Sequence, residues 1–551
     1  MGKLKKKTFK FNKYESLGTA DAETDSLLKS SFVDKGEYSA LTNIDNPKSI
    51  VIGRTGSGKS ALLQKIFEDE QKVIRIEPDS LSLKFLSNST ILEHLRKIDV
   101  NLHFFYKVLW KHVFIVEVIK LYLGEEGNKK QNLFTKLGQT IRVGSKADKA
   151  RKKALEYFDN WSEEFWEHSE HRITNITKAL EDNLRKELGA DYKGLLANYS
   201  KTKINSQTES SEIKSKAESV ISKLQAADLI KITDILSKDV FNNTQRKYFI
   251  LIDDLDKEWV SQQVAYDLIG ALIEVIKEFQ QKFTGVKIII ALRENLHNII
   301  FSGKQHRGGQ REKITPLYLN LTWSSQELHQ LIDNRLSELS GNKINLDEIF
   351  HNSKNKKASF NYIIERTYLR PRDLISFFNK IIEEANNKSH FNGGMVKRAE
   401  PSYSTERLQA LEDEWYDNFG EINKVYKFLI GMNDGFNLKN VKEDPFAEIL
   451  VEESSLSKLK GELYDIAHSW RNSKSSAANF KTFKCGVLFI LYRIGIIGIK
   501  KDASTKTLFF YDKDANITLK DFNNDSKIYV HKSLYSALNI NSKEQEVDFL
   551  K

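Results

Sequence analysis

The chain has 551 residues, which is too long for one ordinary hydrophobic core and predicts two to four domains. Apolar residues make up 40% and charged residues 29%, as in ordinary globular proteins, and the net charge of +10 permits an anionic partner without identifying one. The single cysteine, Cys485, excludes an internal disulfide framework and a cysteine-ligated zinc site. With no apolar signal segment after the basic start, these features favour a cytoplasmic protein.

Six lysines lie within the first 13 residues. They predict a basic N-terminal arm over residues 1–30, which is either a solvated terminus or a contact for nucleic acid or acidic lipid. We expect an ATPase core to follow over residues 31–325.

The stretch "SIVIGRTGSGKSALLQKIF" is the strongest motif in the chain. It fits G-x-x-x-x-G-K-[ST], with an apolar strand before the glycines and a helix after them. Such a loop wraps a phosphate with backbone N–H groups at a helix N-terminus. Lys59 is expected to reach the β- and γ-phosphates, and the Ser60 hydroxyl is expected to ligate Mg²⁺. The predicted nucleotide-binding residues are Gly53, Arg54, Thr55, Gly56, Ser57, Gly58, Lys59, Ser60 and Ala61.

A second strand is predicted over residues 72–78, and a helical insertion over residues 85–245 then interrupts the core. Its most apolar stretch, residues 104–124, carries Lys107, Lys111, Glu117 and Lys120. A membrane span would have to bury these charges, so the stretch predicts a packed helix and no membrane insertion.

The stretch "KYFILIDDLDKEW" is an apolar run that ends in aspartates. It predicts a buried parallel strand whose carboxyl end lies where open α/β sheets place their chemistry. Asp253 is expected to hold Mg²⁺. Asp254 would orient or deprotonate the attacking water, and Asp256 is the next candidate. The alternative for Asp254 and Asp256 is capping of the following helix.

A fourth strand is predicted over residues 286–295 and a fifth over residues 316–323. Arg293 at the tip of the fourth strand is the first candidate to sense the γ-phosphate, and Asn295 is the second. Arg293 could instead pair with a neighbouring aspartate. Between these strands, Arg307 and Arg311 are either an arginine finger for a neighbouring subunit of an oligomer or part of a solvated basic loop.

This order of strands resembles the additional-strand class of P-loop ATPases, which includes the AAA+, KAP and STAND groups. "IDDLDK" looks like the DDLD element of KAP-type ATPases, and "YLRPRDLISFFNKI" resembles the start of the lid helix of AAA+ and STAND relatives. This resemblance implies that Arg372, with Arg370 as the second choice, reaches back to the nucleotide. Either arginine could instead be a surface charge at the start of an amphipathic helix.

The whole order also resembles a bacterial P-loop ATPase family, through "FVDKGEYSAL", "LRENL" and "LTWSSQELHQLIDNRL". The chain departs from the usual pattern because no glutamate follows Asp253, which favours slow hydrolysis. The resemblance points to defence against phage or plasmid, or to DNA maintenance.

Three further parts are predicted: a helical lid over residues 326–400, a helical connector over residues 401–470 and a winged-helix-like domain over residues 471–551. Its wing would carry Lys500, Lys501 and Lys506, which suit DNA phosphates, although winged helices also contact proteins.

The sequence therefore predicts an α/β P-loop core with a five-stranded parallel sheet. The expected function is that of a Mg²⁺-dependent ATPase that acts as a nucleotide-gated switch, with a homo-oligomer or an effector protein as partner. One alternative is a DNA-binding winged-helix protein in which ATP is structural or regulatory. The other is a small-molecule phosphotransferase, which the phosphate loop alone permits.

Overall fold

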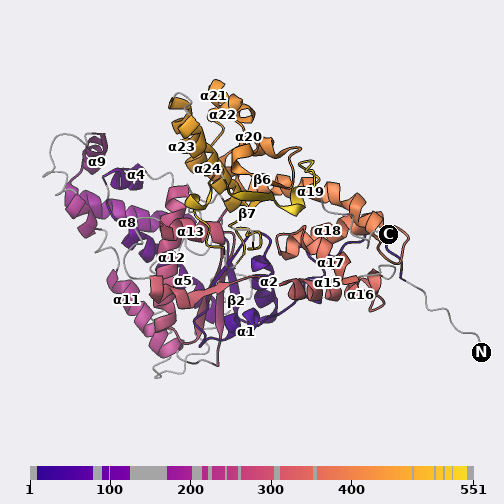
Figure 1. Cartoon of the computed structure of the whole chain (residues 1–551). Coiled ribbons are helices and arrows are strands. Elements are labelled where there is room, and N and C mark those ends of the chain that lie inside the picture. The colour runs from indigo at the N-terminus through magenta and orange to yellow at the C-terminus, as the bar shows by residue number, and fades with distance from the viewer. Residues whose placement is uncertain are drawn as a thin grey trace, which may run out of the picture. The chain divides into compact units, whose positions relative to one another are not determined.

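The computed structural model describes residues 9–78, 90–98, 100–123, 170–201, 214–220, 226–241, 243, 245–257, 262–302, 311–350, 356–473, 477–501, 504–512, 515–523 and 525–542. It divides into two compact units (Figure 1). Unit 1 comprises Met1–Val33, Thr55–Ser57 and Thr322–Lys551, and unit 2 comprises Asp34–Arg54 and Gly58–Leu321.

Unit 2 is built on a sheet that has five parallel strands among the described residues. The strands are β1 (Ile50–Gly53), β2 (Val73–Ile76), β3 (Tyr248–Ile252), β4 (Val286–Arg293) and β5 (Tyr318–Asn320), in the order β2-β3-β4-β1-β5. The predicted five-stranded parallel sheet is confirmed. Strand β4 lies between β1 and β3 in this sheet.

The crossover rule explains which helices share a face of this sheet. The step from β1 to β2 runs opposite to the steps from β2 to β3 and from β3 to β4. Because crossovers between parallel strands are right-handed, opposite steps place their helices on opposite faces. Helix α2 (Lys59–Asp69) therefore covers one face, and α5 (His103–Leu123) and α12 (Gln262–Lys282) share the other.

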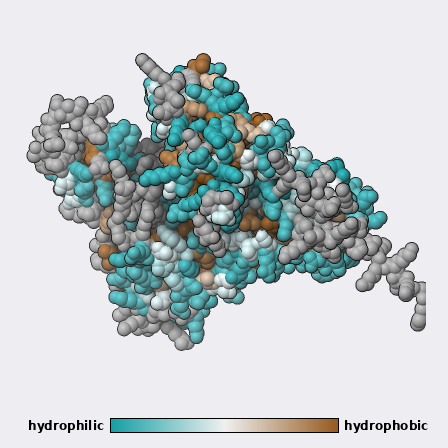
Figure 2. All heavy atoms as spheres, in the orientation of Figure 1, coloured by the Kyte–Doolittle hydropathy of each residue, from teal (hydrophilic) through white to brown (hydrophobic). Residues whose placement is uncertain are grey.

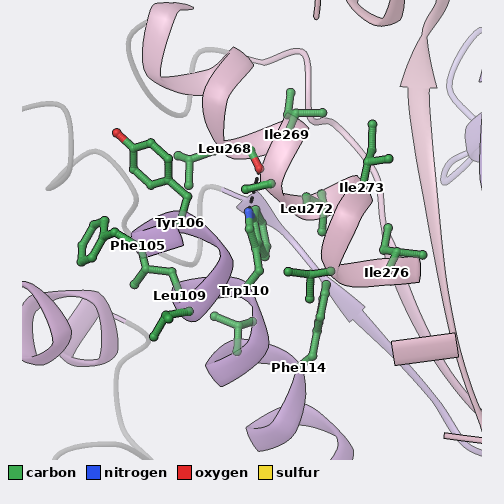
Figure 3. Packing of buried hydrophobic residues seen from close by; sticks show 14 of the residues in the cluster. Phe105, Tyr106, Leu109, Trp110, Phe114, Leu268, Ile269, Leu272, Ile273 and Ile276 are labelled. Carbon is green, nitrogen blue, oxygen red and sulfur yellow. Dashed lines mark hydrogen bonds between the residues drawn. The ribbon is translucent and has the colours of Figure 1, made fainter. Parts of the chain in front are cut away.

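Helices α5 and α12 pack along each other, as Figure 3 shows. Trp110 and Phe114 of α5 are buried and face leucine and isoleucine side chains of α12, while the buried Phe105 points away from α12. The Trp110 indole N–H donates to the Leu268 carbonyl at 2.9 Å, so its polar atom is satisfied inside the core.

The charges of α5 pair with the same neighbour. Lys107 contacts Glu274 and Glu278, and Lys111 contacts Glu278. The prediction of a packed helix is therefore confirmed. In the part of the chain that the structure describes, no helix has the length and apolarity needed to cross a bilayer.

The other described elements of unit 2 are mostly helical, as predicted for the insertion. They are α1 (Glu37–Thr42), α4 (Thr90–Lys97), α8 (Glu170–Leu188), α9 (Tyr192–Lys201), α11 (Ala226–Ile235), the π-helical turn η2 (Leu236–Val240), α13 (Glu294–Ser302), α14 (Arg311–Ile314) and the 3-10 turn η4 (Thr315–Leu317). Pro316 lies in η4, so the fifth strand begins at Tyr318 and is shorter than predicted.

The first core of unit 1 belongs to a bundle of helices. They are α15 (Ser325–Ser340), α16 (Leu346–Ile349), α17 (Lys356–Ile364), α18 (Pro371–Glu384) and α19 (Gly393–Phe419). Pro371 opens α18, where its missing N–H costs nothing. A capping box between Ser324 and Glu327 fixes the start of α15.

The N-terminal segment 9–33 belongs to this same core. Phe11 is 1% exposed and stacks on Phe391, and Leu17 is fully buried. Arg335 donates to the Leu17 carbonyl and pairs with Asp25 at 2.7 Å. The described part of the predicted basic arm is therefore packed rather than solvated, because its apolar side chains fill the helical core.

The second core of unit 1 takes in residues from Tyr368 and from Leu411 to Leu538, on both sides of the boundary predicted at residue 470. Its elements are α20 (Asn423–Tyr426), η5 (Lys427–Leu429), β6 (Gly435–Asn437), η6 (Leu438–Asn440), η7 (Asp444–Phe446), α21 (Ala447–Val451), α22 (Glu453–Leu456), α23 (Gly461–Asn472), α24 (Ala477–Ile494), β7 (Ile497–Lys500), η8 (Leu519–Asp521), β8 (Lys527–Val530) and η9 (Lys532–Leu534).

The described strands of this core form an antiparallel sheet in the order β6-β8-β7. Ile499 and Leu508 form an isolated antiparallel bridge, and β8 is the neighbour of β7. On the face drawn in Figure 2, the described surface residues are mostly hydrophilic, with scattered hydrophobic ones.

Candidate nucleotide site

The loop between β1 and α2 has the backbone that its glycines predict. Gly56 has φ 77° and Gly58, the N-cap of α2, has φ 96°. Side chains with a Cβ rarely adopt these values, so glycine is required for the tight turn. Lys59 is 9% exposed, and its ammonium donates to the Gly53 and Arg54 carbonyls at 3.2 Å each. The lysine therefore lies folded back along the loop that is expected to hold phosphate.

Two hydroxyl groups of the loop are buried without a hydrogen-bond partner among the described residues. They belong to Thr55 and Ser57. A buried hydroxyl without a partner costs roughly 1–3 kcal/mol, so these two groups are candidates to hydrogen-bond a ligand. This observation fits a loop built for a phosphate.

The aspartates after β3 have different surroundings. One Asp253 carboxylate oxygen accepts the Asp254 N–H at 2.9 Å. Asp254 has φ 58°, and its half-exposed carboxylate pairs with Lys257 at 2.7 Å. Asp256 forms an ion pair with Arg293. Burial raises the pKa of Asp256, against the opposing charges of Arg293 and Lys59.

The pairing of Arg293 with Asp256 is the structural alternative that the sequence left open for this arginine. Its role as a sensor of the γ-phosphate stays a prediction, as does that of Asn295. Arg307 lies outside the described residues. Arg311 begins α14, and its side chain also lies outside the description.

Glu294 is a residue that the sequence reasoning did not select. It is the first residue of α13, directly after β4. Burial raises the pKa of its carboxyl group, while the positive charges of Arg54 and Lys59 oppose that rise. Its position at a strand tip was visible in the sequence, but its nearness to Lys59 depends on the pairing of β1 with β4.

Magnesium has suitable ligands in Ser60 and Asp253, because hydroxyl and carboxylate oxygens are what this hard cation prefers. The described residues contain no group of three or more histidine, cysteine, aspartate or glutamate side chains that could hold a metal by themselves.

Within unit 1, each carbonyl of the loop tip Thr55–Ser57 accepts a hydrogen bond. Arg370 donates to the Thr55 carbonyl at 2.8 Å, the Arg372 backbone N–H to the Gly56 carbonyl at 3.3 Å, and the Trp323 indole to the Ser57 carbonyl at 2.7 Å. A Cβ on Gly56 would lie 2.8 Å from the Arg372 Cβ, so this contact also requires glycine. The start of α18 thus fixes the conformation of the loop tip.

The two arginines of "RPRD" differ in their surroundings. Arg370 is 3% exposed and donates to the buried Asp373 carboxylate at 2.9 Å. The Arg372 guanidinium donates to the Ala20 carbonyl at 3.1 Å. Burial and the charge of Arg370 lower the pKa of Arg372. Neither arginine is a free surface charge, and their contacts with nucleotide stay predictions.

Comparisons with known proteins found a family model, a curated protein and a solved structure that are similar to this chain. Residues 326–412 match the family described as FunZ-associated C-terminal helical domain. A protein of Escherichia coli (strain K12) called "Putative transposon gamma-delta 80.3 kDa protein" is 22% identical over 96% of this chain and 68% of its own length. The structure of a Walker-type ATPase of Pyrococcus abyssi is 10% identical, with 87% of this chain and 93% of that chain covered and a TM-score of 0.33.

Proposed function

We propose that the chain binds and hydrolyses ATP with Mg²⁺ and works as a nucleotide-gated switch. The observation that carries this proposal is the loop after β1, in which positive-φ glycines precede a buried Lys59 at the start of α2. Unpartnered buried hydroxyls in the same loop support it. Loops of this kind typically bind a phosphate through backbone N–H groups and a lysine.

The residues have separate roles in this proposal. Backbone N–H groups of residues 53–61 and the Lys59 ammonium bind the β- and γ-phosphates. Ser60 and Asp253 hold Mg²⁺, which neutralises charge on the phosphates when it is bound. Arg372 contacts the nucleotide, so the γ-phosphate changes the arrangement of the lid helices and the affinity for a protein partner or a second copy of the chain.

The test is ATP binding by the Lys59→Ala variant in the presence of Mg²⁺. We expect the affinity to fall by on the order of 100-fold, because charge-assisted contacts to the phosphates are lost. Lys65→Ala is the matched control, since Lys65 lies on the same helix in an ion pair with Asp69. Equal affinity of the parent chain and Lys59→Ala would refute the proposal.

The biological setting that we propose is conflict with mobile DNA, either as defence or as DNA maintenance. It is supported by the similarity, over nearly the whole chain, to a protein named for a transposon. The test compares phage plating and plasmid retention in bacteria that carry the parent chain or Lys59→Ala. A protective effect that persists in Lys59→Ala would separate this role from ATP.

A DNA-binding protein with structural ATP is the second candidate, and the antiparallel sheet β6-β8-β7 with its preceding helices favours it. Two lysines of the predicted wing are paired with carboxylates. Lys501 contacts Asp521 at 3.8 Å, and Lys506 contacts Asp512 at 3.3 Å. Here duplex DNA should bind without ATP, with an affinity that falls steeply with salt. The absence of binding at low salt would remove this candidate.

A further inference from the structure

The chain needs a carboxylate base for ATP hydrolysis, and the aspartates after β3 have other partners. Asp253 is the expected metal ligand. Asp254 is turned into a half-exposed pair with Lys257, and Asp256 pairs with Arg293. Each of the three aspartates therefore already has another expected role or a cationic partner in this arrangement.

Glu294 lies on the neighbouring strand tip. In the pairing of β1 with β4, Gly53 stands beside Arg293, so Glu294 follows at the level of Arg54, the next residue of the phosphate loop. Strand β3 ends earlier, since Ile252 pairs with Ile290. This register places Glu294 beside the phosphate loop, and the charges of Arg54 and Lys59 oppose the rise in its pKa that burial causes. No described residue donates a side-chain hydrogen bond to this carboxylate.

We propose that Glu294 is the general base of ATP hydrolysis. This inference rests on the proposed function. The water oxygen forms a bond to the γ-phosphorus of ATP. At the same time, the bond from that phosphorus to the oxygen that bridges the β- and γ-phosphates breaks. One proton of the water passes to the Glu294 carboxylate, and the leaving oxygen departs as part of ADP.

The burial of Glu294 supports this role. Because burial raises its pKa, the carboxylate is a stronger base than an exposed glutamate. The alternative role of Glu294 is to neutralise the charges of Arg54 and Lys59 before nucleotide binds. A counter-charge would compete with the phosphates, so its removal would raise ATP affinity and leave turnover unchanged.

The experiment measures ATP affinity and turnover of the full chain with Mg²⁺ for the parent, Glu294→Gln and Asp254→Asn. We expect Glu294→Gln to bind ATP at least as tightly as the parent and to lose turnover by on the order of 100-fold or more, since a general base contributes roughly that factor. Asp254→Asn should keep turnover within a few-fold of the parent. Retained ATP binding shows that Glu294→Gln is folded at the site.

Two further variants sharpen the result. Glu187→Gln is the matched control, because Glu187 is exposed on α8. Its turnover should equal that of the parent. Glu294→Asp keeps the carboxylate with a shorter reach and should recover part of the turnover that Glu294→Gln loses. The parent should also lose turnover as the pH falls through the pKa of Glu294, and this dependence should be missing in Glu294→Gln.

The outcomes separate the two proposals. Parent-like turnover in Glu294→Gln, with or without an inactive Asp254→Asn, overturns the assignment of Glu294. If the parent chain binds ATP without hydrolysing it, the assignment of Glu294 as general base is refuted. The proposal of a switch that works by ATP binding is then retained. A parent chain that does not bind ATP overturns the proposed function itself.

Discussion

The buried side chain of Lys287 stabilises part of unit 2 through hydrogen bonds. It belongs to β4, is 1% exposed, and its ammonium donates to the Ala40, Asn43 and Asn46 carbonyls at 3.1, 2.6 and 2.9 Å. The three acceptors lie in α1 and in the segment that leads from it to β1. The apolar run of the strand did not indicate this role, because the acceptors lie more than 240 residues earlier in the chain.

Replacing Lys287 by methionine keeps the length of the side chain and removes the donors. We expect the free energy of unfolding to fall by roughly 2–4 kcal/mol, because partly buried carbonyls lose their partner. Chemical denaturation measures it. Lys282→Met is the control: Lys282 lies in an exposed pair with Asp234, and such pairs contribute about 1 kcal/mol or less. Equal losses in both variants would contradict the role given to Lys287.

At the scale of elements, Asp373 joins α18 to α19. Its carboxylate is fully buried and accepts hydrogen bonds from Arg370, from Arg407 and from the Tyr368 backbone N–H. Burial alone would raise the pKa of Asp373, but Arg370 and Arg407 outweigh it and hold the pKa well below its usual range. The network therefore stabilises the ionised form of Asp373.

Asp373→Asn should cost roughly 3–5 kcal/mol of stability at neutral pH, because two buried arginines lose their carboxylate. Since the folded pKa lies below the unfolded value of about 3.9, this contribution is complete above about pH 5 and is lost as the pH falls below about 4. Denaturation series at several pH values measure the difference between parent and variant. The exposed Asp347→Asn is the control, and a difference that does not shrink in acid would contradict the linkage.

The contact of Trp323 with the phosphate loop is a second prediction at this scale. Trp323→Phe removes one hydrogen bond to the Ser57 carbonyl, and with it part of the preorganisation of the loop. We expect ATP affinity to fall about fivefold, which corresponds to about 1 kcal/mol. Trp470→Phe is the control in a titration with ATP, because the buried Trp470 indole has no hydrogen-bond partner to lose among the residues that the structure describes. Unchanged affinity in Trp323→Phe would show that this bond does not prepare the loop.

At the scale of the whole molecule, ATP should stabilise the folded chain by mass action. With Mg²⁺ and ATP at about 100 times the dissociation constant, the free energy of unfolding should rise by about 2.7 kcal/mol. Thermal unfolding measures the shift, and Lys59→Ala should reduce it to about 0.4 kcal/mol at the same ATP concentration, because a 100-fold weaker affinity leaves ATP near its dissociation constant. Chelation of Mg²⁺ should reduce it in the parent, since Ser60 and Asp253 are expected to act through the metal. A shift of equal size in Lys59→Ala would place the nucleotide elsewhere.

The sequence by itself determined the phosphate loop, the strands of the parallel sheet and the start of α18 at Pro371. These are local features: glycines meet the need for positive φ, apolar runs mark buried strands, and proline suits the first turn of a helix. Only the tertiary structure decided that Arg293 pairs with Asp256, that Glu294 stands beside the phosphate loop, and that residues 9–33 complete the helical core of unit 1. Each of these depends on which strands and segments become neighbours, and that is set by packing between residues far apart in the chain.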